Sequence, residues 1–112
     1  MPFKFTEKGN LMILNSDSYL NPEDNQLITD ELKKILELGK KNFVVNLEAN
    51  PYINSMGLSF LINLLTRVRT AGGEIVLCNI SEKIEQLLIL TRLRSIFNVC
   101  ENLEDAVKQF AR

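Results

Sequence analysis

The sequence predicts a single α/β domain over residues 1–112, with a mostly parallel mixed sheet and helices packed on it. Short apolar runs rich in β-branched residues alternate with longer segments that repeat apolar residues at helical spacing. The order of these segments is β-β-α-β-α-β-α-β-α, and strands that alternate with helices form right-handed βαβ units. The chain has 112 residues and 46% hydrophobic residues, which suits one core of two or three packed layers.

The first elements are predicted to form an antiparallel hairpin at one edge of the sheet. Residues 3–8 alternate apolar and polar side chains, as a half-exposed strand does. Gly9 and Asn10 suit a tight turn, after which residues 11–14 form a more apolar strand. The polar connection that follows ends at Asn21, and a proline and two acidic residues come directly after it. This pattern predicts the start of a helix. The asparagine can cap it, the proline fixes the φ of its first residue, and the acidic residues place negative charge in its first turn.

The later elements follow from the same signals. The first helix continues to Leu36 and is closed by Gly39. A buried strand is predicted over residues 43–47, and the helix after Asn54 extends to about Thr70. The remaining elements are a strand over residues 74–79, a helix starting at Ser81, a short strand over residues 97–100 and a last helix capped by Asn102.

The chain is organised around the motif Asn54, Ser55, Met56, Gly57 and Leu58, which lies between the buried strand and the central helix. Asparagine and serine are favoured helix N-caps because their side-chain oxygens accept bonds from unpaired N–H groups. Such a helix start also attracts negative charge, so a phosphate on the hydroxyl of Ser55 would find its countercharge in place. The simpler interpretation is that Asn54 or Ser55 only caps the helix.

The central helix is predicted to be apolar on two sides. At about 100° per residue, one face carries Leu58, Leu61, Ile62, Leu65 and Val68, and the opposite face carries Met56, Phe60 and Leu64. The first face is expected to be core. The second is either covered by the first helix or forms a stripe that binds a partner protein.

No catalytic residue, metal site or cofactor site is predicted. The chain contains no histidine, which removes Ser-His and Cys-His systems and most zinc sites. Cys78 and Cys100 lie in apolar runs without CxxC spacing and are expected to be buried and reduced. Neither nucleotide-binding glycine motif occurs, and the carboxylates are scattered at the ends of elements.

Composition also limits the partners. A net charge of −1 argues against nucleic acid, which normally requires a basic excess. No run reaches the ~18 to 20 apolar residues of a membrane span, and the first residues lack the apolar segment of a signal peptide. The expectation is a cytoplasmic protein that is monomeric or weakly dimeric and does not insert in a membrane.

Several stretches together resemble a STAS domain, the family of bacterial anti-sigma factor antagonists and of related domains in sulphate transporters. These stretches are residues 46–48, 52–58, 72–81, 90–97 and 103–107, in the family's order over almost the whole chain. The family's motif reads Asp-Ser-Ser/Thr-Gly-Leu, and its first serine matches Ser55. The resemblance implies that this serine is phosphorylated by a partner kinase that is also the anti-sigma factor. The unphosphorylated protein would hold the anti-sigma factor, and the phosphorylated protein would release it.

We expect the partner interface to comprise Asn21, the motif from Asn54 to Leu58, and the stripe of Met56, Phe60 and Leu64 that helical periodicity indicates. The sequence departs from the family pattern within this set. Within the motif, Asn54 replaces the aspartate and Met56 replaces the second Ser/Thr. Asn21 replaces a second acidic residue, near the start of the first helix. Outside the interface, Arg92 replaces a glycine that follows Thr91. Amides carry no charge and recruit a kinase's basic groups less well than carboxylates do.

Two other functions stay open at this level. The chain could be a constitutive STAS subunit of a membrane lipid- or anion-transport complex, with no phosphorylation. An enzyme or nucleotide-binding protein has little support, because the sequence offers no cradle for a cofactor. Membrane-fraction co-purification with a transporter ATPase would favour the first, and tight nucleotide binding that is lost on substitution of Ser55 or Asn54 would favour the second.

Overall fold

In the part of the chain that the structure describes, the five-stranded sheet has one antiparallel pair, which its first two strands form. The computed structural model describes residues 3–16 and 22–110. The strands are β1 (Phe3–Lys8), β2 (Leu11–Ser16), β3 (Asn42–Asn46), β4 (Glu74–Cys78) and β5 (Asn98–Cys100). The helices are α1 (Pro22–Glu37), α2 (Ser55–Thr70), α3 (Glu82–Leu90) and α4 (Leu103–Phe110). The strands lie in the order β1-β2-β3-β4-β5, with parallel pairing from β2 to β5. The predicted fold class and element order are confirmed.

The hairpin at the edge of the sheet has the two-residue turn that the sequence predicts. Lys8 and Leu11 are paired across it, and Gly9 has a φ of 61°. Hairpin turns of this length require a positive φ, which glycine adopts without strain.

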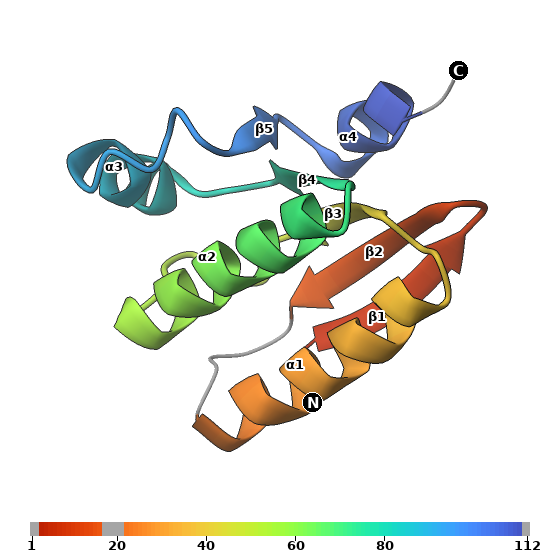
Figure 1. The fold of residues 1–112 in the computed structure, drawn as a ribbon. Coiled ribbons are helices and arrows are strands. Elements are labelled where there is room, and N and C mark those ends of the chain that lie inside the picture. The colour runs from red at the N-terminus through yellow and green to blue at the C-terminus, as the bar shows by residue number, and fades with distance from the viewer. Residues whose placement is uncertain (1–2, 17–21, 111–112) are drawn as a thin grey trace.

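Alternation of side chains along the strands divides the core into two layers. The larger layer contains Met12, Leu14, Phe43, Val45, Ile75 and Leu77 from the sheet, packed with buried residues of α1, α2 and α3. The smaller layer contains Leu11, Ile13, Val44, Val76, Cys78 and Cys100, packed with Ala106 of α4. Figure 1 shows α1 and α2 lying alongside each other, with α4 at the other side of the sheet. The helices thus cover both faces, as parallel strands require.

The buried residues of α2 form one continuous arc rather than two opposite faces. They are Gly57, Phe60, Leu61, Leu64, Leu65 and Val68. At 100° per residue they span about 140° of the helix circumference. The centre of this arc lies between the two faces that periodicity suggested. Ile62, which we expected in the core, falls outside it and is 36% exposed.

The end of α2 depends on a close backbone approach at Gly73. A Cβ atom on this residue would lie 1.9 Å from the carbonyl oxygen of Lys41. That same oxygen accepts the backbone N–H of Glu74 at 3.0 Å. Glycine at this position therefore lets β4 begin directly beside β3, which a side chain would prevent.

The two cysteines are free and buried, as predicted. Cys78 on β4 and Cys100 on β5 are direct partners in the parallel register. Burial, together with smaller contributions from the neighbouring Cys100 and Glu48, raises the pKa of Cys78 to about 12. Burial also raises the pKa of Cys100. Both groups are protonated thiols at neutral pH and poor nucleophiles.

Candidate functional site

The candidate site is the start of α2, at the end of the sheet where the parallel strands finish. Asn54 is the N-cap, with an extended backbone at φ −90° and ψ −176°. Its side-chain oxygen accepts the backbone N–H of Gly57 at 2.9 Å, and its carbonyl oxygen accepts the N–H of Leu58 at 3.0 Å. The predicted capping role is confirmed and belongs to Asn54.

Ser55 is the first residue of α2, and its side chain is exposed. Since Asn54 provides the cap, the hydroxyl of Ser55 is not required to hold the helix start. No hydrogen bond to this hydroxyl is found within residues 3–16 and 22–110. The first turn of α2 also carries no acidic residue. The positive end of the helix dipole, equivalent to roughly +0.5 charge, therefore lies beside Ser55 without a carboxylate in the first turn to neutralise it.

A row of three asparagines holds the loop that leads from β3 to this site. Asn46 donates from its amide to the oxygen of Asn15 at 2.9 Å. The oxygen of Asn46 in turn accepts the amide of Asn79 at 3.0 Å and the backbone N–H of Glu48 at 3.1 Å. The row joins the ends of three neighbouring strands, so the loop leaves a fixed base.

Two further contacts fix the middle of the loop. The hydroxyl of Ser16 donates to the side-chain oxygen of Asn50, and both residues are buried. The hydroxyl of Ser81 donates to the carbonyl oxygen of Pro51 and also accepts the N–H of Ile84 at 3.1 Å as the cap of α3. The loop before Ser55 is therefore attached both to β2 and to α3. The contact between Ser16 and Asn50 is buried, and satisfied polar contacts in the interior favour one conformation.

Close packing at Gly57 joins the loop to the helix. A Cβ atom on Gly57 would lie 3.2 Å from the Cβ of Ile53, which is tighter than an ordinary contact. The glycine of the motif thus lets Ile53 pack against the first turn of α2. This packing contact holds the loop in a defined position relative to the first turn of α2, which begins with Ser55.

The structure brings only part of the predicted interface to the surface. Asn54 and Ser55 are exposed, Met56 and Leu58 are half-buried against the core, and Gly57 is buried. Asn21 lies outside the residues that the structure describes.

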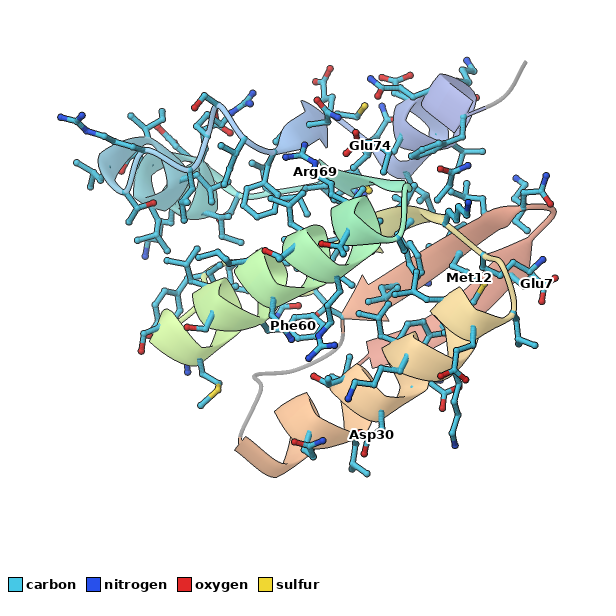
Figure 2. All side chains as sticks on the ribbon, viewed as in Figure 1. Glu7, Met12, Asp30, Phe60, Arg69 and Glu74 are labelled. Atoms are coloured by element: carbon cyan, nitrogen blue, oxygen red, sulfur yellow. The ribbon has the colours of Figure 1, made fainter. Side chains whose placement is uncertain are left out.

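The prediction of an exposed stripe on α2 is wrong for Phe60 and Leu64, which are buried. Phe60 is 1% exposed and Leu64 is 0% exposed. Both belong to the core layer that contains Ile28 and Leu32 of α1. Figure 2 shows Phe60 on the side of α2 that faces α1. These side chains are covered by the first helix, which is the simpler of the two interpretations, and they cannot contact a partner while α1 stays in place.

The loop anchors were missed at the sequence level. In the sequence these anchors resemble ordinary strand ends and turn residues; they are Asn15, Asn46, Asn50 and Asn79. Their hydrogen bonds connect positions that are 31 to 34 residues apart in the chain. The only available signal was that a polar amide follows each of three apolar strands. In parallel sheets those ends meet at one edge.

Other kinds of site have no support in the described part of the chain. Residues 3–16 and 22–110 contain no group of three or more His, Cys, Asp or Glu side chains placed to hold a metal ion. Within the same residues, no helix has the length and apolar character needed to cross a bilayer.

A comparison with protein families identifies the class of protein that this fold and site define. The model of the STAS domain family matches residues 3–106. Since this match includes nearly all of the sequence, the chain belongs to the STAS domain family. The resemblance stated from the motifs is confirmed.

Relatives and solved structures of known name agree with this assignment. The anti-sigma-B factor antagonist of Staphylococcus aureus is 27% identical over 88 residues, which are 79% of this chain and 78% of that protein. The crystal structure of TM1081 from Thermotoga maritima superposes with a TM-score of 0.86 at 25% identity, covering 98% of this chain and 95% of that one. The Bacillus cell fate determinant SpoIIAA in its phosphorylated form has the same fold, with a TM-score of 0.75 at 14% identity over 96% of this chain and 97% of that one.

Proposed function

We propose that this chain is a cytoplasmic anti-sigma factor antagonist that binds an anti-sigma factor with serine kinase activity. Phosphorylation of Ser55 switches it, releasing the anti-sigma factor so that it can hold its sigma factor and repress transcription. The observation that carries the proposal is the exposed Ser55 at the start of α2, with the capping role taken by Asn54. The names of relatives support the same role.

The helix start suits a phosphate on Ser55. A phosphate adds about −1.5 to −2 charges, which the dipole of α2 and the N–H groups of its first turn stabilise. No carboxylate of the first turn opposes it. The modified protein stays folded, while its surface at Ser55 changes from a neutral hydroxyl to a bulky anion.

The same charge weakens a docked partner. An interface formed over Asn54, Ser55, Met56 and Leu58 would enclose a small hydroxyl, and a phosphate at that point adds volume and charge to a closed contact. Burying an unpaired charge costs far more than burying a hydroxyl. Phosphorylation therefore separates the partners without any change in the fold.

Asn54 gives the site one feature that differs from the usual family motif. The amide caps α2 as a carboxylate does but adds no negative charge beside the phosphate. The phosphorylated form is then stabilised by the helix without repulsion from its own cap. A kinase that recognises this site must do so without an acidic residue at position 54.

The experiment is phosphosite mapping on protein isolated from its native cells, in growth and in stress. Trypsin releases a peptide over residues 42–67 that contains both Ser55 and Ser59, so fragment ions must separate the two. The proposal expects phosphate on Ser55, with an occupancy that changes with condition. Ser55 unmodified in every condition, on a protein still found in a complex, would favour a constitutive STAS subunit of a transport complex and contradict the switch.

A further inference from the structure

An apolar groove lies next to the candidate site, between α3 and the loop that precedes α2. It is lined by Tyr52, Ile53, Lys83, Gln86, Leu87 and Leu90. Its volume is about 270 Å³, below the range of about 300–1,000 Å³ that is typical of small-molecule sites. A side chain from another protein therefore fits it better than a cofactor does.

The rim of the groove is apolar and exposed. Leu90 is 81% exposed, Tyr52 is 48% exposed, and the adjacent Ile89 is 56% exposed. Single exposed apolar residues are normal, but a cluster of them around a depression indicates an interaction site. Lys83, Leu87 and Leu90 follow one another at helical spacing, so α3 presents them along one face.

The groove has a positive charge without a counterion. Lys83 is exposed, and in the described part of the chain no carboxylate pairs with it. No acidic side chain lines the groove. The nearby Glu85 is occupied by Arg94, at 2.7 Å. An apolar segment with its own carboxylate would complement this surface in both shape and charge.

The groove is rigidly connected to Ser55. Tyr52 and Ile53 belong to the loop that the hydrogen bond from Ser81 to Pro51 attaches to α3. Ile53 also packs against Gly57 in the first turn of α2. A partner seated in the groove would therefore contact Ile53, two residues before Ser55.

The charge pattern favours a protein over a membrane surface. Helices that lie on membranes carry several basic residues on their polar face, whereas α3 has Lys83 together with the acidic residues Glu82 and Glu85. The groove is concave, and an apolar helix face seats naturally in such a depression.

We infer that the groove between α3 and residues 52–53 docks a helical segment of the partner protein. That segment places an apolar side chain between Tyr52 and Leu90 and a carboxylate against Lys83. This inference deepens the proposed function, because it states which surface beside Ser55 holds the partner and what chemistry the partner presents. A phosphate on Ser55 then repels the acidic segment directly, in addition to filling the interface.

The test is photo-crosslinking in native cells, with benzoylphenylalanine introduced into the full chain at position 90 or at position 38. Leu38 is the matched control, because it is 78% exposed at the end of another helix and does not line the groove. Position 90 should give an adduct with one protein, mapped by mass spectrometry to a segment where an apolar residue lies within one helical turn of Asp or Glu. Adding Lys83→Glu should reduce the yield about tenfold, whereas Lys33→Glu on α1 should leave it unchanged.

Several results would overturn the inference. These are a yield at position 90 no higher than at position 38, an adduct with lipid, an adduct with a second copy of this chain, or a yield unaffected by Lys83→Glu. The proposed function fails separately. An adduct of the expected chemistry on a protein that is not an anti-sigma factor would support docking in the groove but would contradict the proposed role as an anti-sigma factor antagonist. Condition-dependent phosphate on Ser55 without a groove adduct would do the reverse.

Discussion

Arg92 holds a backbone conformation that glycine adopts without strain. It follows Thr91, the C-cap of α3, and has a φ of 63°. A side chain in this left-handed region costs roughly 1–2 kcal/mol. The glycine usual at this position of the family is therefore explained by backbone geometry, and the arginine is a local departure.

Replacing this residue should stabilise the protein. Arg92→Gly removes the left-handed strain, and we expect a gain of about 1 kcal/mol in the free energy of unfolding, measured with urea. Asn79→Gly is the control, since Asn79 also has a positive φ of 55° but donates to Asn46. A loss of stability in Arg92→Gly would show that the arginine makes a contact worth more than the strain.

Asn54 should contribute to stability through one hydrogen bond. Asn54→Ala leaves the N–H of Gly57 without its acceptor, and should cost about 1 kcal/mol. Asn54→Asp keeps the acceptor and adds a charge that the helix dipole favours, so its stability should stay within about 0.5 kcal/mol of the parent or exceed it. Equal stability of Asn54→Ala and the parent in urea would contradict this assignment of the cap.

Cys78 should make the protein less stable in alkali. Its thiol has an ordinary pKa of 9.0 and a folded pKa of about 12. Between these values the unfolded chain releases a proton that the folded chain retains, so the stabilisation is fully present below about pH 9 and is lost as the pH rises toward about 12. Unfolding free energies measured from about pH 8 to about pH 10.5 should fall less steeply in Cys78→Ala than in the parent. An identical pH dependence of the two proteins would contradict a raised pKa.

Individual residues could be predicted from sequence where their partners are local. Asn54 bonds to a residue three positions away, and the preference of asparagine for helix starts is enough to find it. Asn46 could not be assigned in this way, because Asn15 and Asn79 reach it only once three strands are aligned. Arg92 was found as a departure from the family, but its positive φ required the structure.

At the scale of the element, α2 shows what helical periodicity can and cannot determine. Its limits followed from a cap at Asn54 and a glycine pair after Thr70, and both are confirmed. Periodicity gave the set of apolar residues but not the direction of the core. With apolar side chains on most sides, only the position of α1 decides that Phe60 is buried and Ile62 is exposed.

This arrangement predicts unequal costs for two truncations within one helix. Phe60→Ala should destabilise the protein by about 3–5 kcal/mol, because it opens a cavity between α1 and α2. Ile62→Ala should cost less than about 1 kcal/mol, because the isoleucine is already partly hydrated and alanine favours the helix. Similar costs for the two variants in urea would contradict the buried arc.

At the scale of the whole molecule, the element order was the most predictable property. Strands and helices alternate with clear start and stop signals, and right-handed crossovers then leave few topologies. The sequence could not show that the loop over residues 47–53 is tied to both β2 and α3. Nor could it show that a groove opens beside the motif, since its lining comes from two separated segments. Both features depend on tertiary contacts that no local pattern encodes.

The most direct test of the switch is the affinity of the partner for the two forms of the protein. Calorimetry would compare the unphosphorylated chain, the chain phosphorylated on Ser55 and Ser55→Ala against the anti-sigma factor kinase of the same organism, without ATP during the titration. We predict tight binding by the first and third forms and binding at least about tenfold weaker by the second, a loss of about 1.4 kcal/mol or more. Equal affinities of the phosphorylated and unphosphorylated forms would contradict a switch at the start of α2.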